Sequence, residues 1–438
     1  MTSSMPYPIN PISQGVNMLE LLQRWRREFH RYPEPAWCEY RTSSLIADAL
    51  QEAGYQILLD EQIISPSAVM GRKIDEDKEK ARALEQGANA SWLEKMRYTG
   101  VVAVMDTGKP GPCIALRVDL DAVQIGESQK LEHRANQEKY ASQVHSCMHA
   151  CGHDGHAAIG VVLGLILAQH KSRLVGKLKL IFQPAEEGCR GGKAMALSGI
   201  LDDIDCLYAL HLGINACSGE IVVAPEGFLC STKFDVEFIG KAAHAAIEPN
   251  AGANALAAAC LAISQMLAIP VHRDGMTRIN VGTLHAPGER NVIPAYARLE
   301  GETRGESAAL NDYVFSAVQR IVQGAAFSHG VDYQIIRQGE AISIANTPTL
   351  VHEITRQAET LGFNIIHSRP FGASEDAGFL LERVQRRGGQ AAYLLIGSDL
   401  AAGHHNDEFD FDEQSMVNGV ILLQRLILNG LTSCDIAT

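Results

Sequence analysis

The sequence lacks a long apolar run and has no excess of positive charge. Its longest apolar stretch, residues 157–168, is too short to span a bilayer. Lys and Arg number 38 against 51 Asp and Glu, a formal net charge of −13, which disfavours nucleic acid and anionic membrane surfaces as partners. We therefore expect a soluble protein, and 438 residues are enough for two or three domains with a sizeable core.

Patterns typical of secretion and of two common kinds of enzyme are also absent. The ten cysteines show no paired spacing, and residues 1–17 have no basic region followed by an apolar core, so we predict a cytoplasmic protein in a reducing compartment. The sequence has no Gly-x-Ser-x-Gly motif and no glycine-rich loop for phosphate. These absences argue against serine hydrolases and nucleotide-binding enzymes.

Nine residues from Met148 to His156 carry the densest set of metal-binding side chains in the sequence. They include one thiol, three imidazoles and one carboxylate, and they begin a buried helix predicted over 155–170. Thiolate, imidazole and carboxylate together suit a divalent ion, and Cys151 and His153 form a Cys-x-His pair that can face one centre. A buried Cys among hydrogen-bonded histidines is the alternative for each residue alone, but the cluster as a whole favours a metal.

Further potential ligands follow predicted strands at the point where each strand ends. Strands over 113–118, 178–182, 206–210 and 391–396 lead directly or by a short loop into acidic residues or histidines. In an open α/β sheet the carboxyl ends of the strands are where sites assemble. The collected candidates are Asp119, Asp121, Cys151, His153, Glu186, Glu187, His211 and one of His404 and His405.

This set of side chains is too large for one closed structural zinc site. Two metals about 3.5–4 Å apart that share a bridging group would use them and leave positions open for water and substrate. Because adjacent side chains at a strand end point in different directions, one of Glu186 and Glu187 can bind metal while the other removes a proton from water. The reaction class predicted is hydrolysis.

The pattern of elements changes between residues 228 and 339. There the order β-α-β-β-α-β predicts a small α+β domain inserted into a larger α/β domain formed by residues 1–227 and 340–438. His244, Asn291 and Arg304 fall in the inserted domain, and a lone His in a turn is usually inert. Residues 63–97 are polar and charged and are expected to form a surface insertion.

Seven strings in the same order resemble one known family. They are similar to the amidohydrolase branch of the aminoacylase-type two-metal peptidases (peptidase family M20), which also holds hippurate and indoleacetyl-amino-acid hydrolases. The resemblance covers nearly the whole chain and rests on RVDLDAV, MHACGHDGH, QPAEEG, ALHL, GKAAHA, NVIPA and HHNDEFDF.

The resemblance implies a role for each matching residue. Glu186 would be the general base, and Asp121 would orient a ligand, whereas Asp119 is left out because related aminopeptidases carry a metal-binding His there. The inserted domain would be a lid and dimerisation domain whose His244 stabilises the oxyanion, often across the dimer interface, while Asn291 and Arg304 meet the polar end of the substrate. The implied metal ligands are Cys151 as the bridge with His153, Glu187, His211 and His405, in preference to His404.

The charged segment 63–97 narrows the expected substrate. Most members of the branch lack it. Together with GHHN at 403–406 and FDFDEQ at 409–414 it resembles one subgroup, and this resemblance implies cleavage of p-aminobenzoyl-glutamate, an N-acyl-glutamate from folate breakdown, to p-aminobenzoate and glutamate. The resemblance implies two divalent ions, with zinc or manganese suiting the ligands, a homodimer and a second related subunit. The alternatives are a general N-acyl-amino-acid amidohydrolase or dipeptidase, and a metal-free, non-catalytic binding protein.

Overall fold

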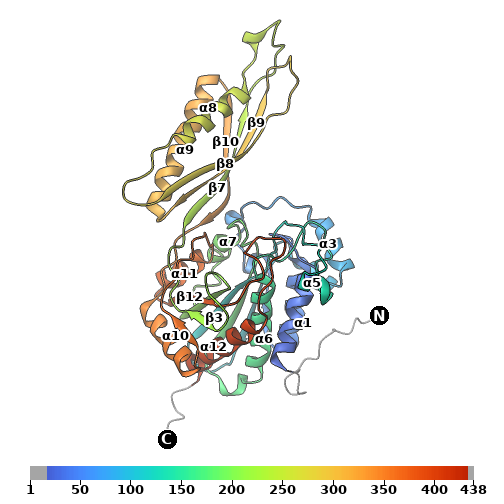
Figure 1. Cartoon of the computed structure of the whole chain (residues 1–438), viewed down its shortest axis with the longest axis vertical. Coiled ribbons are helices and arrows are strands. Elements are labelled where there is room, and N and C mark those ends of the chain that lie inside the picture. Colours follow the sequence, from blue (N-terminus) through green and yellow to red (C-terminus); the bar gives the residue numbers. More distant parts are fainter. Residues whose placement is uncertain (1–16, 433–438) are drawn as a thin grey trace.

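The computed structural model describes residues 17–432 and contains two β-sheets. Residues 1–16, in which no signal peptide is expected, lie outside this part of the chain. The larger sheet has eight strands in the order β1-β2-β4-β3-β5-β12-β6-β11 (Figure 1). Their bounds are Gln56–Leu58, Val101–Asp106, Lys177–Gln183, Cys113–Asp119, Cys206–Leu212, Gln390–Ile396, Glu220–Val222 and Asn364–Ile366.

The four central strands of this sheet are parallel. Leu116 of β3 pairs with Leu180 of β4 and with Tyr208 of β5, and β12 continues parallel to β5. The strands predicted from the sequence are therefore confirmed, and their carboxyl ends lie along one edge of the sheet. The outer strands β1, β2 and β6 pair antiparallel to their inner neighbours, so the sheet is mixed.

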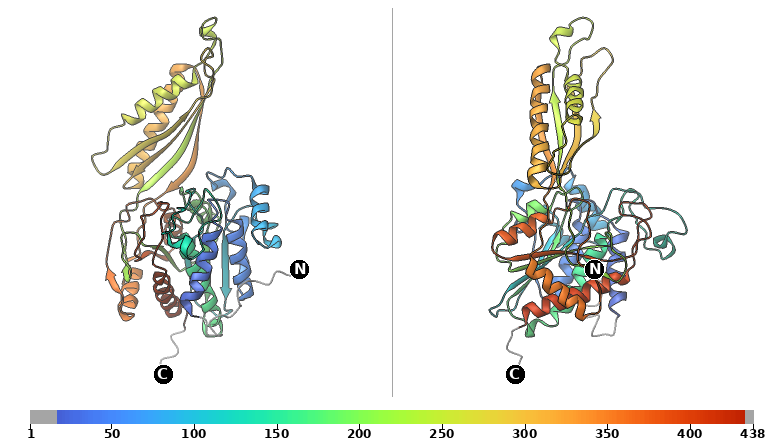
Figure 2. Two further views of the ribbon diagram at one scale, coloured as in Figure 1. Left: turned by 45° about the vertical axis from the view of Figure 1, so that its right-hand side comes forward. Right: turned by 60° about the vertical axis from the view of Figure 1, so that its left-hand side comes forward.

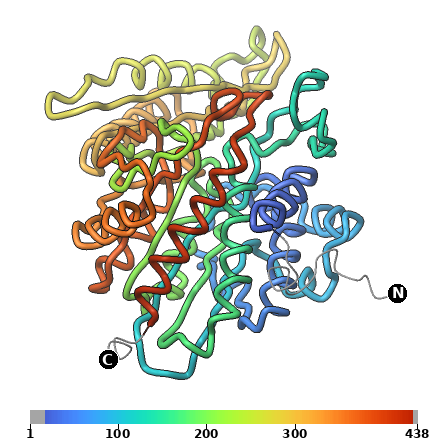
Figure 3. The backbone as a smooth tube through the Cα atoms, turned by 60° about the horizontal axis from the view of Figure 1, so that its bottom comes forward, coloured from blue at the N-terminus to red at the C-terminus, as the bar shows by residue number. Residues whose placement is uncertain are grey.

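Helices cover both faces of the larger sheet and make it the middle layer of an α/β/α fold. One core contains residues of seven helices, including α3 (Glu76–Glu85) and α4 (Ala90–Leu93) of the charged segment, and the core on the opposite face contains residues of two. The helix α6 (His153–Ala168) is apolar all round because it is buried between the sheet, α1 and α12, which cross the same face (Figure 3). The first face also carries α1 (Met18–Arg31), α2 (Tyr40–Glu52), α10 (Pro348–Thr360) and α12 (Gln414–Leu431). The second face carries α7 (Gly192–Ala196) and α11 (Gly378–Arg386).

The smaller sheet is antiparallel and extends away from the larger one (Figures 1 and 2). Its order is β10-β7-β9-β8, and helices α8 (Ala255–Leu267) and α9 (Ala308–His329) pack on one of its faces around a separate core. We propose residues 228 and 339 as the boundaries of the inserted domain. The first falls just before β7 and the second falls within β10. The strands span Asp332–Ala341, Cys230–Ile239, Tyr296–Gly305 and Thr277–His285.

The segment 63–97 is less exposed than its charge suggests. It contains the helices α3 (Glu76–Glu85) and α4 (Ala90–Leu93), and Ile63, Ile64 and Met96 are fully buried. Arg82 of α3 donates to the Glu34 carboxylate at 2.9 Å, which joins the segment to the larger domain. The expectation of a solvated surface insertion was therefore wrong for one side of the segment, because its scattered apolar residues reach the core.

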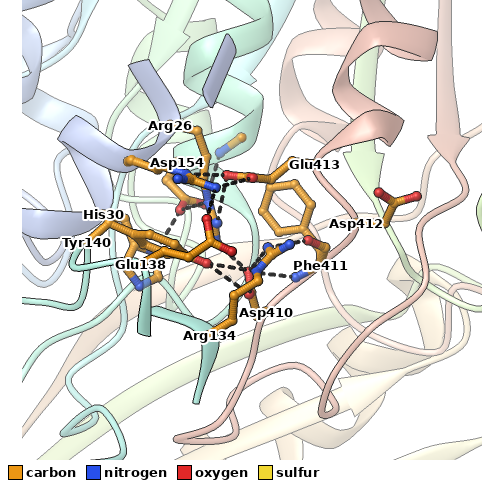
Figure 4. A network of polar contacts seen from close by, with 12 residues as sticks. Arg26, His30, Arg134, Glu138, Tyr140, Asp154, Asp410, Phe411, Asp412 and Glu413 are labelled. Carbon is orange, nitrogen blue, oxygen red and sulfur yellow. Dashed lines mark hydrogen bonds and ion pairs between the residues drawn. The ribbon is translucent and has the colours of Figure 1, made fainter. Parts of the chain in front are cut away.

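A buried ionic network fixes the loop before α12 to the first turn of α6 (Figure 4). The Arg26 guanidinium, with no exposed surface, contacts Asp154 at 2.8 Å, Asp410 at 2.8 Å and Glu413 at 3.2 Å. A second helix, α5 (Arg134–Gln137), adds Arg134, whose side chain also bonds to Asp410. Since Asp410 and Glu413 follow His405 in the chain, the network holds the carboxyl-terminal loop of the predicted site in place.

His30 in the same network is expected to make stability fall at alkaline pH. Burial lowers its pKa, but hydrogen bonds to the Asp154 and Glu127 carboxylates outweigh this and the repulsion by Arg26, and raise the pKa to about 9. A folded-state pKa above the unfolded value of about 6.5 means that the stabilisation is complete below pH 6.5 and is lost as the pH rises through 9. We expect a loss of about 2–3 kcal/mol across this range.

Urea unfolding of the wild type and of His30→Gln between pH 6 and 9.5 measures this contribution. The wild type should lose more unfolding free energy over the range than the variant does. Equal losses in the two proteins would show that His30 is not protonated in the folded state.

Candidate metal centre

Cys151, His153 and His211 converge at the carboxyl edge of the larger sheet. Their donor atoms lie within 4.8 Å of one another, and Cys151 Sγ is 3.6 Å from His211 Nε2. Gly152, in the left-handed region at φ +89°, separates the thiol from α6, whose first residue is His153. The turn permitted by this glycine lets both side chains of the Cys-x-His pair face one point.

Backbone carbonyls set the tautomers of both imidazoles. His153 Nδ1 lies 2.8 Å from the Asp121 carbonyl and His211 Nδ1 lies 2.9 Å from the Leu212 carbonyl, so each Nδ1–H donates to a carbonyl and each Nε2 is left for the cluster. Among residues 17–432 the buried His153 Nε2 has no hydrogen-bond partner. An unpartnered buried ring nitrogen beside a thiolate is the arrangement that a metal ion completes.

A second group of ligands shares Cys151 with the first. The Cys151, Glu187 and His405 donors also lie within 4.8 Å of one another, and His405 Nε2 is 3.1 Å from Glu187 Oε1. The His405 amide donates to the Ala150 carbonyl at 2.8 Å, which fixes the carboxyl-terminal loop against the residue before the thiol. The geometry thus gives two three-ligand groups joined at one sulfur, a pattern suited to a pair of ions.

The neighbouring His404 lies elsewhere. Its ring packs against His211, with centroids 5.4 Å apart, and against Phe409 at 5.0 Å. It belongs to none of the donor groups found among residues 17–432. The preference for His405 over His404 therefore agrees with the placement of the two rings.

The charges of the cluster favour a cation at its centre. Burial alone would raise the pKa of the Cys151 thiol, but His211 and His153 lower it well below its usual value, so the thiolate is the stable form. Cys151 and Glu187 raise the pKa of His405 to about 10. The same two negative groups attract a divalent ion, and the donor set of thiolate, imidazole and carboxylate fits such ions.

Glu186 lies where the ligand cluster meets a buried acidic group, since it forms one set of donors within 4.8 Å with His153 and Glu187 and another with Glu375 and Asp376. Burial and the charges of Glu375, Glu187 and Asp376 raise its pKa well above that of an ordinary carboxyl group. One of its oxygens remains 4.0 Å from His153 Nε2, at the edge of the ligand cluster. A carboxyl group with a raised pKa beside the cluster is a stronger proton acceptor than an ordinary carboxylate.

The two glutamates sit on a tight turn that follows β4. Asp121 Oδ1 and Oδ2 accept the amide hydrogens of Glu186 at 2.9 Å and Glu187 at 2.8 Å. The flanking residues Ala185 (φ +55°) and Cys189 (φ +58°) adopt the left-handed conformation, which costs energy for residues with a Cβ atom. Asp121 therefore has the supporting position that its sequence context suggests, since it fixes His153 through its carbonyl and both glutamates through its carboxylate.

Asp119 is held by residues for which the sequence predicted no role. Its carboxylate accepts from Arg117 Nη1 at 2.9 Å and from His156 Nδ1 at 2.5 Å. His156 Nε2 in turn accepts the Leu212 amide at 2.9 Å, next to His211. This chain of bonds uses both ring nitrogens of His156, so the residue supports the strand end of β5. Arg117 and Asp119 are two residues apart on β3 and so lie on the same face of the sheet. This spacing was the sequence signal that could have predicted their ion pair.

His244 and Asn291 do not join the cluster within one chain. Both are exposed, and they lie in loops beyond the β7–β9 register pair Ile239 and Tyr296, at the end of the smaller sheet far from the larger domain (Figures 1 and 2). His244 Nδ1 accepts the amides of residues 246 and 247, which leaves the Nε2–H as an exposed donor. Arg304 lies near the opposite end of β9 and donates to Glu302 at 2.9 Å.

A cavity of about 870 Å³ lies between the two domains beside the cluster. Glu187 lines it from the larger domain, Lys73 and Asp75 from the charged segment, and Asp235 and Arg298 from the smaller sheet. The cavity is large enough for a small organic molecule, and it reaches the second ligand group through Glu187. A substrate held there would lie against the ligand cluster.

The three-layer domain, the inserted sheet and the paired ligand groups define a metal-dependent hydrolase with a small-molecule substrate. The family model described as Peptidase family M20/M25/M40 matches residues 115–429, and the chain belongs to this family. It is therefore an enzyme that hydrolyses an amide bond. Among residues 17–432, no helix combines the length and apolar character needed to cross a membrane.

Known relatives match over nearly the full length of the chain. The chain is 44% identical over 428 residues to the p-aminobenzoyl-glutamate hydrolase subunit of Escherichia coli (strain K12), covering 95% of this chain and 98% of that one. It is 42% identical over 420 residues to indole-3-acetyl-aspartic acid hydrolase of Enterobacter agglomerans, covering 94% and 96%. The solved structure of aminobenzoyl-glutamate utilization protein from Klebsiella pneumoniae matches with a TM-score of 0.80 and 38% identity, covering 96% and 97%.

Proposed function

We propose that this protein hydrolyses p-aminobenzoyl-glutamate to p-aminobenzoate and glutamate, a step of folate breakdown. The observation that carries the proposal is the 44% identity with the p-aminobenzoyl-glutamate hydrolase subunit of Escherichia coli across almost all of both chains. The cavity beside the ligand cluster supports it, because an aromatic acyl group and a dicarboxylic amino acid fit within about 870 Å³.

In this proposal two divalent ions, manganese or zinc, occupy the two ligand groups. Cys151 would belong to both groups, His153 and His211 would complete one of them, and Glu187 and His405 would complete the other. When bound, such ions polarise a carbonyl group and lower the pKa of a water molecule. The protein's own residues then orient the ligands and move the proton.

Glu186 is the proton acceptor of the proposed reaction. Its carboxylate removes a proton from the attacking water and passes it to the leaving amine nitrogen, which separates glutamate from the acyl group. Asp121 holds the backbone of Glu186 and Glu187, so the base and the ligand keep a fixed relation. The raised pKa of Glu186 suits a residue that must take a proton and then return it.

The inserted domain is proposed to pair with a second copy of the chain. His244 would then reach the partner's substrate, where its Nε2–H can donate to the developing oxyanion. Asn291, at the same end of the smaller sheet, would meet the polar end of that substrate, and Arg304, at the opposite end of β9, would meet the polar end of the substrate in its own chain. The distance of His244 from its own cluster supports this arrangement. Sedimentation equilibrium tests the homodimer, and mixing with a second related subunit tests whether that partner is required.

We also propose a cytoplasmic location. The nine cysteines that the structure describes are all free, which agrees with a reducing compartment.

A second candidate function is hydrolysis of other N-acyl amino acids. The 42% identity with indole-3-acetyl-aspartic acid hydrolase favours substrates with a bulky aromatic acyl group and an acidic amino acid. A general N-acyl-amino-acid amidohydrolase or dipeptidase would use the same ligand cluster with a different acyl pocket. Substrate profiling separates these functions, since they share the catalytic residues.

The experiment that tests the proposal is release of p-aminobenzoate by the purified full chain after loading with manganese or zinc. Indole-3-acetyl-aspartate and a panel of other N-acyl amino acids are measured in parallel. Preferential release of p-aminobenzoate is the expected result. Cleavage of the other substrates with none of p-aminobenzoyl-glutamate would favour the second candidate, and a chain that binds no metal and cleaves nothing would favour a non-catalytic binding protein.

A further inference from the structure

The acidic side chains that line the cavity are already paired with protein groups. Asp235 Oδ2 alone accepts from Lys73 at 2.9 Å, Arg298 at 2.7 Å and Gln338 at 2.6 Å. The other lining carboxylates of the charged segment and the smaller sheet also have partners. Asp75 caps α3, and the ion pairs are Glu79 with Arg82, Glu300 with Arg298 and Glu302 with Arg304. Except for Asp75, which accepts only a backbone amide, these acids therefore have cationic partners other than Arg190 and Lys233.

Arg190 lines the cavity without a carboxylate partner. Within residues 17–432 no carboxylate oxygen lies within 4.0 Å of its guanidinium, its Nε is buried with no hydrogen-bond partner, and Nη1 makes only a long contact of 3.5 Å with the Gly71 carbonyl. A guanidinium offers five N–H donors in a planar fork. Such a group beside a substrate cavity is suited to a carboxylate that the protein itself does not provide.

Lys233 of β7 approaches the same wall from the other domain. Its Nζ lies 4.0 Å from the Sγ atom of Cys189, the residue before Arg190, and its only carboxylate neighbour within residues 17–432 is Glu302, also at 4.0 Å. Glu302 is already bonded to Arg304 at 2.9 Å. Two incompletely neutralised cations, one from each domain, therefore face one part of the cavity.

The turn that carries Glu186 and Glu187 also fixes Arg190. The Arg190 amide donates to the Ala185 carbonyl at 3.0 Å, and the side chain lies between Gly188 and Gly71, where an added Cβ atom would approach the guanidinium or its Cδ to within 3 Å. Glycine at both positions makes room for the arginine. The charged segment, through Gly71, thus forms one side of the position that Arg190 occupies.

We propose that Arg190 and Lys233 form a subsite for the side-chain carboxylate of the substrate's amino acid, and that this subsite selects N-acylated glutamate or aspartate over neutral amino acids. The inference rests on the proposed function, because both candidate substrates carry such a second carboxylate. The α-carboxylate adjoins the scissile amide and so lies close to the ligand cluster. Arg190 packs instead against the charged segment, on the side where an extended acidic side chain would end.

Paired substrates that differ only in this charge test the subsite. With metal-loaded full-length enzyme, kcat/KM for p-aminobenzoyl-glutamate and p-aminobenzoyl-glutamine is measured for the wild type, Arg190→Gln, Arg190→Lys and Lys233→Met. We expect Arg190→Gln to lower kcat/KM for the glutamate substrate by on the order of 100-fold and to leave the glutamine substrate nearly unchanged. Arg190→Lys should retain part of the preference for the glutamate substrate. Lys233→Met should lower kcat/KM for that substrate by about tenfold.

Two controls separate recognition from folding. Lys78→Met removes an exposed cation of the same cavity that has no ion pair among residues 17–432. It should leave kcat/KM unchanged for both substrates. Binding of free glutamate and of glutamine, measured by calorimetry, reports on the subsite without turnover. Tighter binding of glutamate by the wild type, lost in Arg190→Gln, supports the subsite even if p-aminobenzoyl-glutamate is not cleaved, in which case only the proposed function fails.

Other outcomes overturn the subsite. Equal losses for both substrates in Arg190→Gln would assign Arg190 to positioning of the turn or to the α-carboxylate. A wild type that cleaves the glutamine substrate as fast as the glutamate substrate and binds both free amino acids equally would leave the proposed reaction intact and remove the subsite.

Discussion

Replacing Glu186 by Gln should lower kcat by about 10³-fold while the protein keeps its metal ions. The substitution preserves the size of the side chain and removes the group that accepts the proton, an effect of roughly 10²–10⁴-fold for general bases. Glu186 belongs to neither of the two ligand groups that share Cys151, so metal affinity should change little. Steady-state kinetics and the metal content after dialysis measure the two effects separately.

Glu187→Gln is the matched control for this prediction. It alters the adjacent glutamate, whose oxygen lies in the group with Cys151 and His405. We expect it to lose metal as well as activity, because a neutral amide is a poorer ligand than a carboxylate for a divalent ion. Substantial turnover by Glu186→Gln, or loss of metal from it as severe as from Glu187→Gln, would remove Glu186 from the role of base.

Replacing Arg26 by Met is expected to lower the unfolding free energy by about 3–5 kcal/mol. The variant would leave the carboxylates of Asp154, Asp410 and Glu413 buried without their shared cation (Figure 4). Arg26 also packs over the rings of Tyr140 and Phe411, 4.9 Å and 4.5 Å from their centroids. Urea unfolding monitored by circular dichroism at pH 7 measures the change.

The exposed Arg24 on the same helix provides the control. Arg24→Met should shift stability by less than about 0.5 kcal/mol, as surface substitutions commonly do. If Arg26→Met does not fold, Arg26→Lys, which keeps the charge and loses the planar fork, should show an intermediate loss. An unfolding midpoint of Arg26→Met or Arg26→Lys equal to that of the wild type would mean that the network contributes nothing to stability.

Much of the fold was predictable because its main elements have strong local signals. The central strands are continuous apolar runs, and α6 is apolar all round, so periodicity and length identified them. The short strands β1, β6 and β11 have three residues each and carried no such signal. The prediction that segment 63–97 is a solvated surface insertion was wrong on one side, because charged residues dominate its composition while a few apolar residues decide its packing.

The residues of the candidate site were predicted less evenly. Those next to strand ends, such as Glu187 and His211, followed from the rule that parallel strands bring their carboxyl ends together. Glu375 and Asp376 lie in a loop outside the predicted strand ends, yet they lie beside Glu186 and help to raise its pKa. Their proximity to Glu186 joins segments almost 190 residues apart in the sequence, and local patterns do not encode such contacts.

The sequence by itself determined the chemical nature of the site, because the order of strands and the types of side chain at their ends are local properties. The tertiary structure decided which groups share a centre. It joined two ligand groups at Cys151, placed His405 rather than His404 beside Glu187, and left Arg190 without a carboxylate partner among residues 17–432. Whether a charge is paired depends on through-space distances between distant segments, which are fixed only once the two domains have folded and packed.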